Sequence, residues 1–199
     1  MKVDAREIFY NILIDMDKDK IESTIISKPS QIPSIIKEIY RRCIKVIDFH
    51  TDSVKFSIYG ELNEILIHYF LSMAMIPSER KIKYHNDLEI DLVIPTLKQL
   101  RIDSTRALVI SFEKNLDSNI INMHINRLLK IQPNKNNIWL IFGNYYELPD
   151  LYKEFTAFVH DDFMKEPFKP LSCIVDEINA FIEKNKIRSF KILPSTSKL

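Results

Sequence analysis

Glycine is nearly absent from this chain of 199 residues, which contains only Gly60 and Gly143. Loops that hold nucleotide phosphates need several closely spaced glycines, because the backbone itself must approach the phosphate. The scarcity excludes Rossmann and P-loop proteins. No G-x-S-x-G segment is present either, which argues against a serine hydrolase built on a nucleophile elbow.

Metal-binding patterns of cysteine and histidine are also missing. Cys43 and Cys173 each stand alone in an apolar helical pattern, so we expect reduced, buried residues. The five histidines are scattered without the spacing of zinc ligands: His50, His68, His85, His124 and His160. For His68 and His124, which fall in apolar helical patterns, a satisfied or partly buried imidazole is the expected role.

The chain has no long apolar run. Its longest apolar stretch, residues 65–76, is interrupted by His68 and Ser72, whereas a bilayer span needs about 20 apolar residues. We therefore expect no membrane segment, no signal peptide and a cytoplasmic protein. The terminal Ser197-Lys198-Leu199 matches a peroxisomal address, which makes a peroxisomal location the alternative in a eukaryote.

Net charge is close to zero, with 28 basic and 27 acidic residues. No bulk cationic field is available to attract polyanions, so any contact with nucleic acid must come from a local patch. The first candidates are two basic groups: Lys37, Arg41 and Arg42 in a helical pattern, and Lys81 and Lys83 in a strand pattern. For the helical group, a solvated face neutralised by neighbouring acids is the alternative.

The balance of 46% hydrophobic and 28% charged residues is typical of a single globular domain. We expect N-terminal helices in residues 1–59, an α/β core in 60–142, a helical cap in 143–193 and a loose tail in 194–199. Apolar periodicity predicts helices over residues 5–16, 34–47, 61–75, 117–131, 149–159 and 173–184. Strands are predicted over residues 81–84, 88–94, 107–112, 138–142 and 188–193.

These elements predict an α/β fold with a small mixed sheet flanked by helices. The strand over 107–112 is apolar almost throughout, as expected of a central strand that is covered on both faces. Strand, helix and strand over residues 107–142 form a parallel unit. Residues 60–142 thus follow the order αβββαβ, with helical additions at both ends.

Acidic residues occupy suggestive positions in this core. Glu61 and Glu64 fall in the first helix, Asp91 falls in the second strand, and the third strand reads Val109-Ile110-Ser111-Phe112-Glu113-Lys114. The arrangement resembles the core of the PD-(D/E)XK nuclease superfamily, the restriction-endonuclease-like fold that includes archaeal Holliday-junction resolvases. In that family an acid on the first helix, an Asp on the second strand and a (D/E)-x-K pair on the third converge on Mg²⁺.

The resemblance implies specific roles for these residues. Glu61, Glu64, Asp91 and Glu113 are the implied metal ligands, and Asp91, Glu113 and Lys114 are the implied catalytic residues. The third strand departs from the pattern, because Ser111 and Glu113 share one face and Lys114 belongs to the other. Either Ser111 replaces a carboxylate and Glu113 replaces the lysine, or Lys114 comes one residue early and needs a bulge to turn it back.

Two functions stay open. The first is a nuclease-like protein that binds nucleic acid and has Mg²⁺-dependent phosphodiesterase activity. The alternative is a non-catalytic interaction or scaffold protein, a homodimer or a subunit of an archaeal or viral assembly. In that case Asp91 is an ordinary strand carboxylate, paired with Lys81, Lys83 or Arg106.

Overall fold

The computed structural model describes residues 4–47, 52–84, 88–115, 117–143 and 154–187. Its centre is a six-stranded sheet in which each strand lies beside the next one along the chain. β2 (Leu88–Ile94) is antiparallel to both of its neighbours, β1 (Glu79–Tyr84) and β3 (Leu108–Phe112). β4 (Ile138–Ile141), β5 (Thr156–Val159) and β6 (Lys169–Pro170) continue the sheet in parallel from β3. The predicted mixed α/β fold is confirmed.

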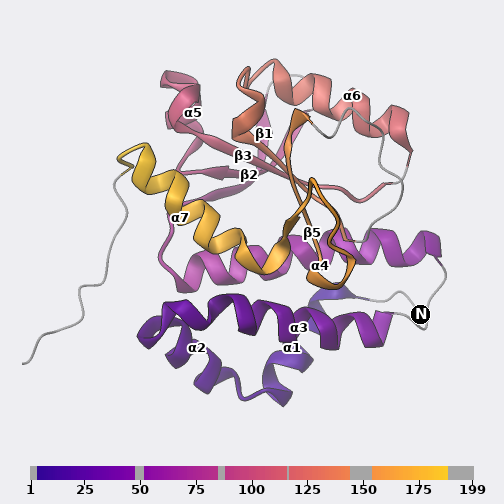
Figure 1. The fold of residues 1–199 in the computed structure, drawn as a ribbon. Helices are drawn as coiled ribbons and strands as arrows, with labels where there is room; N and C mark the ends of the chain where they lie inside the picture. Colours follow the sequence, from indigo (N-terminus) through magenta and orange to yellow (C-terminus); the bar gives the residue numbers. More distant parts are fainter. Residues whose placement is uncertain (1–3, 48–51, 85–87, 116, 144–153, 188–199) are drawn as a thin grey trace, which may run out of the picture.

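Helices cover both faces of this sheet (Figure 1). On one side lie α4 (Asp52–Met73) and α7 (Ile174–Lys184), with α1 (Ala5–Asp15), α2 (Lys18–Ser27) and α3 (Ile32–Ile47) packed outside α4 (Figure 1). The other holds α5 (Leu97–Ile102) and α6 (Ser118–Leu129). Val109 faces the core under α6, whereas Leu108 and Ile110 face the core under α4, so β3 is buried on both sides as its sequence predicts.

Helix α4 is apolar around most of its circumference because it lies between other elements. It contacts β3 on one side and α1, α2 and α3 on the other. Its buried side chains include Leu62, Leu66 and Phe70, none of which is exposed at all. The predicted helix over 61–75 is therefore confirmed, although it begins earlier, at Asp52.

Several elements differ from the sequence-based expectation. The helix predicted over residues 149–159 is wrong for its described part, because Thr156–Val159 is strand β5 between β4 and β6. Four residues are too few to distinguish the helical from the strand period of apolar residues. The position of this segment between β4 and β6 makes it a strand. Helices α2 and α5 are not predicted, and the strand over 188–193 and the tail lie outside the described residues.

Both glycines allow α4 to approach the ends of the central strands. A Cβ atom at Gly60, inside α4, would lie 2.5 Å from Cγ of Lys114 and 2.9 Å from the carbonyl oxygen of Glu113. A Cβ atom at Gly143, after β4, would lie 2.1 Å from Cβ of Tyr59. Such contacts are closer than atomic radii allow. Each close contact therefore requires a glycine. Gly60 lets α4 touch the residues after β3, and Gly143 lets the chain after β4 touch Tyr59 of α4.

None of the helices in the described ranges combines the length and the apolar character that crossing a membrane requires.

We expect Gly60→Ala to destabilise the protein by about 1–3 kcal/mol, the usual cost of overpacking. In an uncrowded helix the same change would stabilise by up to about 1 kcal/mol, so the sign of the effect identifies the cause. Urea unfolding measures it. The matched control is Ser72→Ala, at an exposed position of α4, which should change stability by no more than about 0.5 kcal/mol. A stabilised Gly60→Ala protein would contradict the close contact.

Candidate active site

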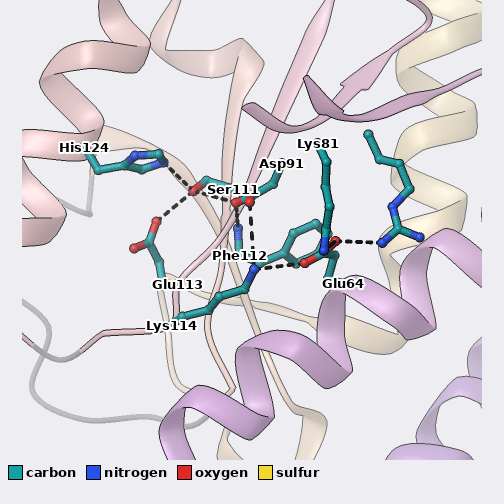
Figure 2. A network of polar contacts seen from close by, with 9 residues as sticks. Glu64, Lys81, Asp91, Ser111, Phe112, Glu113, Lys114 and His124 are labelled. Carbon is teal, nitrogen blue, oxygen red and sulfur yellow. Dashed lines mark hydrogen bonds and ion pairs between the residues drawn. The ribbon is translucent and has the colours of Figure 1, made fainter. Parts of the chain in front are cut away.

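The site begins where β2 and β3 separate. The described pairs between these strands run only from Leu92–Ile110 to Ile94–Leu108. Beyond them, the backbone N–H of Phe112 donates to Oδ2 of Asp91 at 2.9 Å (Figure 2). In a regular sheet this N–H would donate to a backbone carbonyl group of β2. Here it donates to the side-chain carboxyl group of Asp91 instead. Asp91 lies in the fork between the two strands.

Strand β1 is distorted at the same level. Its described pairs with β2 include Arg80–Leu92 and Ile82–Ile90 but omit Lys81, the residue opposite Asp91. Lys81 has a φ angle of 50°, in the left-handed region that non-glycine residues rarely adopt. Backbone strain of this kind is concentrated at functional sites in proteins. The distortion and the fork both lie next to Asp91.

Three side chains converge on the hydroxyl group of Ser111, on the α6 side of the fork. Its Oγ lies 3.0 Å from Oε1 of Glu113, 3.0 Å from Nε2 of His124 and 3.5 Å from Oδ2 of Asp91. Ser111 and Glu113 are only 2% and 5% exposed and share one face, as the strand alternation predicts. A hydroxyl group carries one proton and serves one acceptor, so this cluster holds more acceptors than Ser111 can satisfy.

Lys114 joins Asp91 to a second cluster on the α4 side. Because β3 ends at Phe112, Lys114 lies beyond the strand, and its Nζ is 2.9 Å from Oε2 of Glu64 and 3.9 Å from Oδ1 of Asp91. Glu64, with a side chain only 5% exposed, also contacts Arg80 at 3.0 Å and Lys81 at 3.4 Å. Lys114 therefore reaches Asp91 even though its neighbour Glu113 turns to the opposite face. Figure 2 shows Asp91 between the two clusters.

Burial and charge divide the carboxyl groups into two kinds. Burial raises the pKa of Glu113 to about 7, and the charge of Asp91 acts in the same direction. Burial also raises the pKa of Asp91, against the opposing effects of the Phe112 N–H and Lys114. Glu64 differs, because its contacts with Lys114, Lys81 and Arg80 outweigh burial and lower its pKa. Asp91 and Glu113 thus have raised pKa values despite the charge of Lys114, whereas Glu64 is contacted by three cations.

Two of the acidic residues that the sequence predicts as metal ligands meet at Ser111, namely Asp91 and Glu113. Glu64 reaches Asp91 only through Lys114, and Glu61 is exposed and acts on Lys114 through its charge. Within the described ranges no group of three His, Cys, Asp or Glu side chains is arranged to hold a metal ion. Mg²⁺, however, commonly takes one or two carboxylates and completes its shell with water and phosphate oxygens.

Asp91 and Glu113 match the requirement of Mg²⁺ for one or two carboxylate ligands. Both are hard oxygen donors, both lie within 3.5 Å of one hydroxyl oxygen, and both have a raised pKa that a nearby cation would lower. Glu64 fits it less well, since three cations already contact its two oxygen atoms. The donor set therefore suits a divalent ion held by two protein ligands.

The predicted basic residues fall into two groups. On α3 each has an acidic neighbour: Lys37 lies 3.8 Å from Asp161, Arg41 lies 3.6 Å from Asp162, and Arg42 lies 2.7 Å from Glu38. On β1, Lys81 contacts Glu64 beside the fork, and Lys83 is exposed two residues further along. Only the β1 group adjoins the Asp91 site.

His124 and Arg80 join the site without having been predicted. His124 comes from α6, where Ile121, Ile125 and Leu128 form the stripe that packs on the sheet. It lies within that stripe, three residues after Ile121, so helical periodicity places it on the buried side of α6. Burial lowers the pKa of His124, which favours the neutral imidazole.

In fold this chain is similar to restriction endonucleases. The structure of restriction endonuclease PspGI with substrate DNA matches it with a TM-score of 0.62 and 15% identity, over 92% of this chain and 94% of that one. Metal-depleted Ecl18kI matches with a TM-score of 0.58 and 13% identity, over 96% of this chain and 82% of that one, in complexes with uncleaved DNA and with uncleaved, modified DNA. No family model and no curated protein matches the sequence.

PspGI and Ecl18kI are members of the PD-(D/E)XK superfamily, so this chain has the restriction-endonuclease-like fold. The resemblance that residues 60–142 suggested is confirmed at the level of the fold, and it extends over nearly the whole chain.

The pKa of Glu113 predicts how stability depends on pH. Folding raises this pKa from 4.5 to about 7, so the folded protein favours the protonated form. As pH rises from about 4.5 to 7, the unfolded chain loses the proton first, and the free energy of unfolding should fall by about 1–3 kcal/mol. Glu113→Gln should remove this loss, measured by urea unfolding at pH 5 and pH 8.

The control for that measurement is Glu89→Gln, which changes an exposed carboxyl group on β2 and should leave the wild-type pH dependence intact. An unchanged pH dependence in Glu113→Gln would contradict the raised pKa.

Proposed function

We propose that this protein binds DNA and cleaves it in an Mg²⁺-dependent reaction, with Asp91 and Glu113 as the metal ligands. The observation that carries the proposal is the meeting of these two carboxyl groups, from β2 and from the end of β3, at the Ser111 hydroxyl. The Lys114 ammonium group, 3.9 Å from Asp91, supplies the cation that the family pattern requires. The fold shared with two DNA-bound restriction endonucleases supports DNA as the substrate.

Each side chain has a defined part in this proposal. Bound Mg²⁺ would polarise the phosphodiester group and acidify the attacking water. Lys114 places a positive charge at the edge of the cluster, where a non-bridging phosphate oxygen approaches. Glu64 is a positioning residue, because it holds the Lys114 ammonium group at 2.9 Å. Lys81 and Lys83, exposed on β1, would contact the DNA backbone beside the site.

A second function is favoured by a different observation. If Ser111 and Glu113 align with the (D/E)-x-K pair, a serine replaces the family's carboxylate, and no three-ligand metal group exists in the described ranges. A protein that uses the fold only to bind DNA, another protein or a second copy of itself would not need a complete set of metal ligands. Cleavage and binding assays distinguish the two functions.

We expect wild-type protein to cut linear or branched DNA in the presence of Mg²⁺ or Mn²⁺, and Asp91→Asn to cut at least about 100-fold more slowly. The asparagine carbonyl can still accept from the Phe112 N–H, so the fold should be retained while a metal charge partner is lost. Glu89→Gln, on the same strand, is the matched control and should cut like wild type. Salt-sensitive binding without cutting would support the second function, and cutting by Asp91→Asn at the wild-type rate would refute the proposed site.

The affinity for Mn²⁺ should rise with pH, because the metal competes with the proton on Glu113. We expect up to a tenfold increase per pH unit below the pKa of about 7, and a plateau above it. Isothermal titration calorimetry without DNA gives the affinity. Glu113→Gln should bind more weakly and lose the dependence between pH 6 and pH 7, whereas an identical pH profile in that variant would exclude Glu113 as a ligand.

A further inference from the structure

A groove leads away from the Asp91 site along α4. Its first part, about 540 Å³, is lined by residues that include Lys114, Lys81, Glu64, Arg80 and Arg6. A second part, about 390 Å³, is lined by residues that include Arg6, Arg80, Tyr10 and Tyr69. Arg6, Ile65 and Arg80 line both parts, so the two lie side by side between α1, α4 and β1.

The first part carries the charge of an anion-binding surface. Arg80, Lys81 and Lys114 all contact Glu64, and Glu61, which also lines this part, acts on Lys114 through its charge. Arg6 adds a fourth cation, and it has no acidic partner among the described ion pairs. The carboxyl group of Asp4, which also lines this part, accepts a hydrogen bond from the Arg6 backbone N–H at the start of α1. Four cations thus face three carboxyl groups, which leaves one positive charge in excess, and a phosphate group has the chemistry to pair with it.

The second part has an aromatic lining instead. Tyr10 is 46% exposed on α1, and Tyr69 of α4 is half-buried beside it. Both rings pack edge-on against the buried ring of Phe9, with centroid distances of 5.6 and 5.5 Å. Phe9 therefore holds both tyrosines in place, and the exposed one leaves part of its surface free for another flat ring.

Cations followed by exposed aromatic rings along one groove are the combination that binds single-stranded nucleic acid. Phosphates pair with the cations, and bases that no longer pair with a complementary strand stack on the rings. Duplex DNA would use the cations only, because its bases are stacked on one another inside the helix. The cationic and aromatic linings together therefore favour single-stranded DNA over duplex DNA.

We propose that this groove binds an unpaired DNA strand next to the Asp91 site, with a phosphate on Arg6 and Arg80 and a base on Tyr10. The inference rests on the proposed function in taking DNA as the ligand. It makes branched or single-stranded-tailed DNA the preferred substrate class, and it gives α1, outside the αβββαβ core, a direct part in substrate binding.

The test compares two labelled DNA duplexes of one sequence, one blunt and one with a single-stranded extension, by fluorescence anisotropy in EDTA. Without metal, binding is measured apart from cleavage. We expect wild type to bind the tailed duplex at least about fivefold more tightly, and Tyr10→Ala to lose that preference while binding the blunt duplex as before. Tyr10→Phe should keep the preference, since it retains the ring.

Arg6→Ala should weaken binding of the tailed duplex and lower the salt dependence of its binding constant by about one ion. The matched control is Arg42→Ala on α3, where an exposed arginine is paired with Glu38 and lies outside the groove residues. It should leave the preference for the tailed duplex unchanged.

The outcomes separate this inference from the proposed function. Equal affinity of wild type for both duplexes, or an equal loss on both in Tyr10→Ala, would overturn the groove as a single-strand site and leave DNA cleavage standing. Preference for the tailed duplex without metal-dependent cutting would support the groove and overturn the nuclease. Binding of neither duplex would overturn both.

Discussion

The candidate site depends on one hydrogen bond, between the Phe112 backbone N–H and the Asp91 carboxyl group, at 2.9 Å. This bond satisfies a strand-edge donor where β2 has turned away from β3, and it holds a carboxyl group in the resulting fork. Because the fork opens to both faces of the sheet, Asp91 contacts Ser111 on the α6 side and approaches Lys114 on the α4 side. Without the fork, the two polar clusters would be separated by the sheet.

The close approach of α4 to the end of β3 brings Glu64 and Lys114 together. Gly60 lets the helix touch the chain at Glu113 and Lys114, and Glu64, four residues later on the same side of α4, then meets the Lys114 ammonium group. That ion pair keeps Glu64 ionised and orients the cation toward Asp91. Asp91 and Glu113 keep raised pKa values, because burial outweighs the opposing charge of Lys114 at both groups. Positive charge is thus concentrated around Glu64, on the α4 side of the fork.

Much of the fold was predictable from periodicity, and the site was predictable in part. The central strand, the parallel unit through α6 and the positions of Asp91 and Glu113 follow from apolar patterns that agree with their final burial. Strand β5 was mistaken for helix, because four buried residues show no distinguishing period. The route of Lys114 to Asp91 was not predictable, since it depends on where β3 ends and where β2 diverges, which are tertiary features. His124 was set aside as an ordinary buried histidine, because sequence does not show that its helix lies over Ser111.

The central claim is that Asp91 and Glu113 share one divalent cation. Anomalous X-ray diffraction from crystals grown with Mn²⁺ tests it most directly, because the ion is located independently of any activity. A single manganese peak within coordination distance of both carboxyl groups, lost in crystals of Asp91→Asn, is the predicted result. Manganese bound elsewhere, or a Ser111 cluster that stays unchanged and free of metal at saturating Mn²⁺ above pH 7, would contradict the account.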